Sequence, residues 1–89
     1  MSRIIQRQAT DPELTESQQW QLWQSEDSTT FSYTYDQSVC FVVQAGAAVI
    51  NSKTNAPVAI VAGDHVTIMA GVEAVWDISH PVTNRFQNM

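Results

Sequence analysis

The sequence predicts an all-β fold, a small barrel or sandwich. Short apolar runs of strand length follow one another at close spacing, and no long helical pattern interrupts them. Two of the three glycines, Gly63 and Gly71, enclose one such run at 66–70. Glycine turns a chain sharply because it tolerates positive φ, so the stretch 63–76 is predicted to form turn, strand, turn and strand.

The first nineteen residues are polar and weakly patterned. We expect an irregular N-terminal arm at 1–19 that lies over a single domain at 20–89. The alternative for 10–13 is a short helical turn, because Thr10 or Asp11 is a suitable cap and a proline follows them.

The remaining chain divides into eight apolar or alternating segments. Strands are expected at 20–24, 29–35, 38–44, 47–50, 58–62, 66–70, 74–79 and 82–86, with a bend at 45–46, a hairpin loop at 51–55 and a turn at 79–81. In 29–35 aromatic residues alternate with small hydroxylated ones, which places Phe31, Tyr33 and Tyr35 on one face. Segment 38–44 is apolar on both faces, which is typical of a central strand.

Period-two alternation assigns the side chains of the later strands to two faces. The inward-facing set is Val66, Ile68, Ala70, Ala74, Trp76 and Ile78. His65 is out of phase with this set and His80 lies in a turn, so we interpret both as surface histidines rather than general bases. Asp64 follows a glycine at a corner, and its carboxylate is expected to accept hydrogen bonds from nearby backbone amides.

Charge and cysteine content exclude several classes of protein. The formal net charge is −5 and the four basic residues do not cluster, so nucleic acid and anionic membranes are disfavoured as partners. Cys40 is the only cysteine, which precludes an intramolecular disulfide, and without a basic neighbour in sequence we expect it to be buried and inert. Residues 1–7 lack the apolar run of a signal peptide and no segment has the length of a membrane span, so we expect a cytoplasmic protein.

The order of several motifs over residues 20–87 resembles the small single-domain cupins. These motifs are Trp23, the alternation at 31–35, Cys40, Gly46, Gly63-Asp64, Ala70-Gly71, Trp76 and Arg85-Phe86. The sequence resembles above all the branch that includes the ureidoglycine aminohydrolase and ethanolamine-utilisation cupins. The resemblance implies a compact jelly-roll β-barrel, often dimeric, with a pocket inside the barrel.

Typical cupins bind a divalent metal through four side chains, and the resemblance places those positions at Ser38, Cys40, Gln44 and Ala74. None of the four is a histidine or a carboxylate, and Met69 replaces the proline of the family's second motif. A divalent ion needs charged or imidazole donors that converge on it. We therefore expect no metal and no other cofactor, and we do not transfer the family's metal-dependent chemistry.

Six side chains are expected to point into the barrel. They are Tyr33, Tyr35, Ser38, Cys40, Gln44 and Trp76. Aromatic rings with a few neutral hydrogen-bonding groups are typical of a small-molecule site, whereas the alternative is that the rings simply fill a narrow barrel.

We therefore predict a metal-free cupin that binds a small neutral or weakly polar molecule. One alternative is an enzyme, an isomerase or a hydrolase that acts on a small metabolite. Another is a structural module whose product is a dimer surface. Trp20 and Trp23 are expected to pack on the outside of the sheet, and this apolar face favours a symmetric homodimer.

Overall fold

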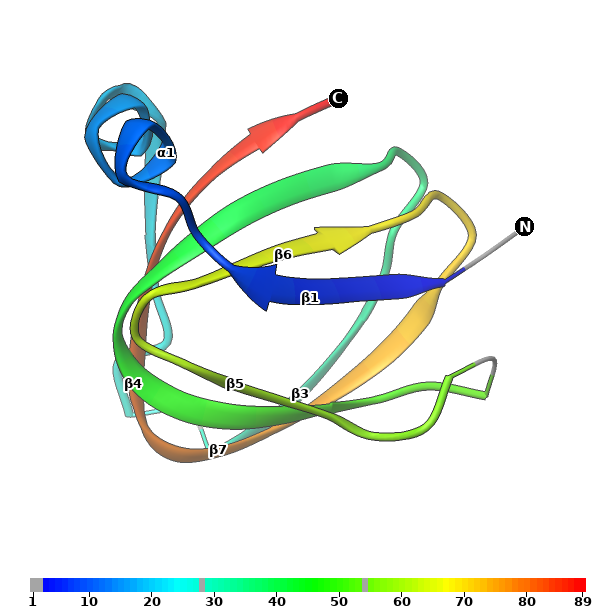
Figure 1. Cartoon of the computed structure of the whole chain (residues 1–89). Coiled ribbons are helices and arrows are strands. Elements are labelled where there is room, and N and C mark those ends of the chain that lie inside the picture. The colour runs from blue at the N-terminus through cyan, green and yellow to red at the C-terminus, as the bar shows by residue number, and fades with distance from the viewer. Residues whose placement is uncertain (1–2, 28, 54) are drawn as a thin grey trace.

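The computed structural model describes residues 3–27, 29–53 and 55–89, and within them it is built mainly of β-strands (Figure 1). The strands are β1 (Ile4–Gln8), β2 (Gln21–Gln24), β3 (Thr30–Thr34), β4 (Val39–Asn51), β5 (Val58–Val61), β6 (Asp64–Ile68) and β7 (Glu73–Asn88). A short helix α1 (Asp11–Glu16) continues into a 3-10 turn, η1 (Ser17–Gln19). The prediction of an all-β, jelly-roll barrel is confirmed.

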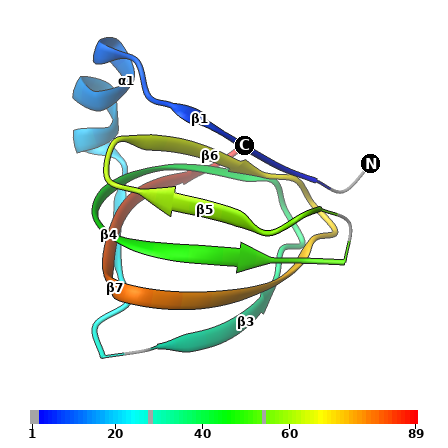
Figure 2. The same cartoon turned by 60° about the horizontal axis from the view of Figure 1, so that its bottom comes forward.

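Two long strands, β4 and β7, organise the sheet. They pair antiparallel along nearly their whole length, from Val39 opposite Asn88 to Asn51 opposite Val75. The first half of β4 also pairs with β6 and the second half with β5, while β7 pairs with β3 and then with β2. Figure 2 shows β5, β4, β7 and β3 side by side. Because each long strand changes neighbours midway, the sheet curls around one core.

Both long strands bend at the same place. The register between β4 and β7 shifts around Gly46, which has a φ of +91°. A Cβ at this position would lie 2.1 Å from the carbonyl oxygen of Pro81 on β7. The predicted bend at 45–46 is therefore a β-bulge, and the predicted turn at 79–81 is a bend inside a continuous strand.

The core lies inside the curl and is built from alternate residues of β4, β6 and β7. The predicted inward side chains Val66, Ile68, Ala74, Trp76 and Ile78 all belong to it. Ala70 was assigned wrongly: β6 ends at Ile68, and Ala70 is exposed in the turn that leads to Gly71. The predicted hairpin joins β4 to β5, although Thr54 of its loop lies outside the described residues.

The N-terminal segment is regular rather than irregular in its described part, which begins at residue 3. β1 pairs with β6 over its whole length. Thr10 caps α1, as the helical alternative predicted: its hydroxyl accepts from the Glu13 amide, and the Glu13 carboxylate accepts from the Thr10 amide at 2.9 Å. The pattern of β1 was missed because only Ile4 is buried in this edge strand. No helix among the described residues has the length and hydropathy needed to cross a membrane.

Candidate functional site

A cavity of about 240 Å³ lies between β2, β3, β4 and β7. Its walls are mainly aromatic and comprise Trp23, Phe31, Tyr33, Tyr35, Phe41, Trp76 and Phe86. The strict alternation predicted at 31–35 places the rings of Phe31, Tyr33 and Tyr35 on the cavity side, whereas Ser32 and Thr34 are exposed. The barrel is therefore hollow at this end.

Trp76 is the centre of the aromatic wall. Its ring stacks on Phe31 with centroids 5.3 Å apart, and it lies 5.6 Å from Phe41 and 5.7 Å from Trp23. Tyr33 contacts Tyr35 edge to face at 4.7 Å, and Tyr33 is 53% exposed. These contacts hold the inner wall rigidly and leave Tyr33 at the opening of the cavity.

Two polar atoms of residues that line the cavity are buried and make no hydrogen bond of good geometry with a described residue. They are Nε1 of Trp76 and Oδ1 of Asn84. Trp76 is 2% exposed and Asn84 is 4% exposed, and both residues line the cavity. An unsatisfied buried group costs about 1–3 kcal/mol. Neither atom is accessible to water, so a molecule in the cavity would reach them only if the wall moved.

Tyr35 adds a neutral hydroxyl to the same wall. Burial raises the pKa of Tyr35 to about 12, and a side-chain hydrogen bond of poor geometry with the Trp76 indole only partly opposes this rise. The phenol is therefore protonated near neutral pH and cannot serve as an anionic base there.

The structure brings together three of the six predicted site residues. Tyr33, Tyr35 and Trp76 line the cavity. Ser38, Cys40 and Gln44 do not, so the expectation that they point into the barrel was wrong.

Cys40 and Gln44 lie on the outer face of β4, and Ser38 directly precedes the strand. The interior positions of β4 are Val39, Phe41 and Val43. The Ser38 hydroxyl accepts from the Ala70 amide at 2.9 Å, the Cys40 sulfur accepts from Gln87 Nε2 at 3.7 Å, and Gln44 lines a surface groove with Leu14 and Gln18.

The phase of β4 could not be read from hydrophobicity because both of its faces are buried. On the outer face, Cys40 is 7% exposed and Val42 is 1% exposed, as well covered as the interior residues. The N-terminal segment provides part of this cover, since Leu14 and Ser17 meet Val42 along the same groove. Cys40 is buried, as predicted.

The positions that hold a metal in typical cupins do not fit one here. Ser38, Cys40 and Gln44 face away from the cavity, and Ala74 offers only a methyl group in the core. Within residues 3–27, 29–53 and 55–89, no three His, Cys, Asp or Glu side chains gather in one place. We derive no chemistry through a metal at these positions.

For two residues of the cavity wall, the structure differs from what the sequence predicted. Trp23 was expected outside the sheet, but it packs against Phe31 and Trp76 inside. Asn84 was not identified as a site residue. The signal was present in β7, because alternation from Val82 to Phe86 places Asn84 on the inward face, a polar residue between two apolar ones.

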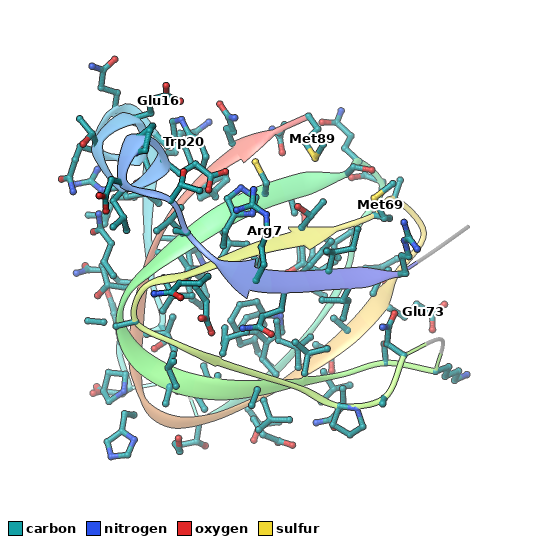
Figure 3. The ribbon with its side chains drawn as sticks, in the orientation of Figure 1. Arg7, Glu16, Trp20, Met69, Glu73 and Met89 are labelled. Carbon is teal, nitrogen blue, oxygen red and sulfur yellow. The ribbon has the colours of Figure 1, made fainter. Side chains whose placement is uncertain are left out.

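The outer face of β6 carries a second polar cluster. The Arg7 guanidinium donates two hydrogen bonds to the Glu13 carboxylate, at 2.6 and 2.7 Å, and His65 Nε2 lies 3.5 Å from the same carboxylate. Trp20 packs edge to face on His65. Figure 3 shows Arg7 on β1 and Trp20 beside α1. His65 therefore faces outward, as predicted, but the N-terminal segment covers it and only 8% of it is exposed.

The remaining sequence assignments near these strands are confirmed. Asp64 accepts from the Val61 amide at 2.9 Å, so it stabilises the corner before β6. His80 is exposed on the bend of β7. Neither residue contributes to the cavity.

A single curled sheet with a cavity between its strands defines a small β-barrel protein. Comparison with known families matches residues 12–86 to the EutQ-like cupin domain. The chain therefore belongs to the EutQ-like cupin family.

Solved structures agree with this assignment of the fold. A DUF861 family protein from Thermotoga maritima superposes with a TM-score of 0.88 at 22% identity, covering 98% of this chain and 100% of that chain. A DUF1255 protein of unknown function from Acidithiobacillus ferrooxidans has a TM-score of 0.62 at 17% identity, covering 65% of this chain and 56% of that one. A search of curated proteins finds no match.

Proposed function

We propose that this cupin binds a small neutral or weakly polar molecule in the cavity between β2, β3, β4 and β7. The observation that carries the proposal is the cavity itself, about 240 Å³ in volume and walled by aromatic rings. An engineered protein cavity of about 150 Å³ already accepts benzene. Aromatic walls with a few polar groups are the usual composition of a ligand pocket.

The charge of the lining supports a neutral ligand. Among the described residues that line the cavity, Asp36 is the one with a charged side chain, and none is basic. An anion would therefore lose its hydration without gaining a cationic partner.

The alternatives drawn from the sequence receive less support. A purely structural module would have a barrel filled by its own side chains, and the cavity counts against that. An enzyme would need a reactive group beside the ligand, and the titratable residues of the lining are Tyr33, Tyr35 and Asp36.

The homodimer and the cytoplasmic location stay predictions. Exposed Val61 and Val75 on the outer side of the sheet favour the dimer.

Fragment screening by NMR tests the proposal. Neutral single-ring fragments are added to ¹⁵N-labelled protein, and the indole N–H resonance of Trp76, assigned with Trp76→Phe, reports on the cavity. We expect some fragments to shift this resonance. Tyr33→Ala is expected to weaken their binding, since Tyr33 lies at the opening, whereas Val75→Ala on the outer face leaves it unchanged. A folded protein whose Trp76 resonance responds to no fragment would contradict the proposal.

A further inference from the structure

We infer that the cavity binds an amphipathic ligand, a flat apolar ring with one neutral hydrogen-bond donor such as a hydroxyl or amide group. The ring occupies the inner end of the cavity, and the donor group lies at the opening beside Asp36. This inference rests on the proposed function and specifies the class of ligand and its orientation. It is carried by the described lining, whose exposed residues all bear a polar group and whose more buried residues are mainly aromatic.

The opening of the cavity is polar. The exposed residues of the described lining are Tyr33, Asp36, Gln37 and Asn88. Asp36 and Gln37 lie in the connection between β3 and β4, and Asn88 is the residue of β7 that pairs with the first residue of β4. These segments therefore meet at one end of the barrel, where the polar group of a ligand stays in contact with water or with these side chains.

The inner end of the cavity is walled mainly by aromatic rings. Trp76 stacks on Phe31, and its ring centroid lies 5.6 Å from that of Phe41. The polar residues of this wall are Tyr35 and Asn84. The Asn84 oxygen and the Trp76 indole nitrogen are inaccessible to water, and the Tyr35 hydroxyl interacts with the same indole. A ligand therefore meets mainly the faces and edges of rings at this end.

The two ends favour different chemical groups. A ring at the inner end gains hydrophobic burial and aromatic contacts. A hydroxyl at that end loses its hydration, which weakens binding by about tenfold when no partner replaces the water. At the opening the same hydroxyl stays hydrated or donates to the carboxylate of Asp36, since an ionised carboxylate only accepts hydrogen bonds. The cavity therefore favours one polar group on the ring, and a group that donates.

Three compounds that differ in the number of hydroxyl groups on one ring test this inference on the unaltered protein. They are p-xylene, 4-methylbenzyl alcohol and 1,4-benzenedimethanol, and their affinities are measured by titration of the Trp76 indole resonance. We expect 4-methylbenzyl alcohol to bind most tightly, about tenfold more tightly than 1,4-benzenedimethanol, whose second hydroxyl is buried at the inner end. A cavity that is apolar throughout would instead favour p-xylene, and a cavity that is polar throughout would favour 1,4-benzenedimethanol.

Nuclear Overhauser contacts establish the orientation of bound 4-methylbenzyl alcohol. We expect its methyl protons to contact the rings of Trp76 and Phe41 at the inner end. Its hydroxymethyl protons are expected to contact Tyr33 and Gln37 at the opening. The reverse pattern would overturn the inference, even if the three affinities rank as expected.

Two alanine variants test the role of Asp36. The reference ligand is 4-methylbenzyl methyl ether, which keeps the oxygen of the alcohol but lacks the donor. Asp36→Ala is expected to reduce the preference for the alcohol over the ether by about threefold, the effect of one hydrogen bond. Asp27→Ala, which removes an exposed carboxylate between β2 and β3 outside the lining, is the matched control and is expected to keep the preference. Equal preferences in the two variants would overturn the requirement for a donor beside Asp36.

The outcomes separate this inference from the proposed function. If p-xylene or 1,4-benzenedimethanol binds most tightly, the cavity still binds a neutral molecule but the inference is wrong. 4-Methylbenzylamine and 4-methylbenzoate carry a positive and a negative end, and tightest binding of either would overturn the inference together with the neutrality of the ligand. If none of these compounds shifts the Trp76 resonance, ligand binding in the cavity is itself contradicted.

Discussion

Gly46 and Gly63 are both held at positive φ, but only Gly46 is pressed against another strand. Their φ values are +91° and +95°. A Cβ on Gly46 would lie 2.1 Å from the Pro81 carbonyl oxygen, whereas a Cβ on Gly63 would have nothing within 4 Å. A comparison of alanine substitutions at these two glycines therefore separates the effect of backbone strain from the effect of steric overlap.

We predict that Gly46→Ala destabilises the protein much more than Gly63→Ala. The Gly63 variant bears only the strain of an L-residue at positive φ, about 1–2 kcal/mol. The Gly46 variant must also displace the backbone of β7, for a total of about 3 kcal/mol or more. The free energy of unfolding in urea measures both. Equal losses would mean that the close approach of β4 to β7 is not a constraint.

At the level of single residues, strict alternation was the informative signal. It placed Tyr33, Tyr35 and Trp76 at the cavity because each lies in a strand with one apolar and one polar face. It gave no answer for Cys40 and Gln44, because β4 is covered on both sides and its apolar run has no polar face to set the phase. Their inward placement followed from the family resemblance and was wrong. Asn84 was within reach of the same rule but was not singled out.

The N-terminal element is attached to the barrel by a polar cluster that depends on pH. The hydrogen bond from Arg7 holds the pKa of Glu13 well below its ordinary value of 4.5, with further help from Thr10. Burial, and then the charge of Arg7, lower the pKa of His65 below 6.5, against the attraction of Glu13. In both groups the unfolded chain binds the proton more readily than the folded chain does.

We therefore predict that the protein loses stability in two steps as the pH falls. His65 contributes fully to the stability above pH 6.5, and this contribution decreases as the pH falls through 6.5 towards the pKa of His65 in the folded protein. Glu13 contributes fully to the stability above pH 4.5 and less below it. Urea unfolding across this pH range measures the effect. His65→Gln should flatten the upper step and Glu13→Gln the lower one, whereas His80→Gln, at an exposed position, is the control. An unchanged profile in His65→Gln would show that the burial of His65 does not influence stability.

Over the whole molecule, stability is expected to decrease from the paired long strands towards the N-terminal segment. β4 and β7 are bonded to neighbours on both sides, whereas β1 is an edge strand with four of its five residues exposed, and α1 has no buried residue. Local opening starts where little apolar surface is buried.

Amide hydrogen exchange tests this gradient. We predict that amides of β4 and β7 near Phe41, Ile50 and Trp76 exchange only by global unfolding, while those of β1 and α1 exchange through local opening at a lower free energy. The dependence of the exchange rates on urea distinguishes the two routes. Protection of β1 equal to that of β7 would show that the N-terminal segment and the barrel unfold as one unit.

The sequence by itself determined the fold class, the inward face of β6 and β7 and the aromatic side of the cavity, because each depends on local periodicity and on residues that turn the chain. The order of the motifs from Trp23 to Arg85-Phe86, above all those at 63–71 and Trp76, also indicated the family. Only the tertiary structure decided which face of β4 is interior, that β1 joins the sheet, and that Trp76 and Asn84 meet at one cavity. These features depend on contacts between segments far apart in the chain, and the pattern within a single segment carries no information about what covers its other face.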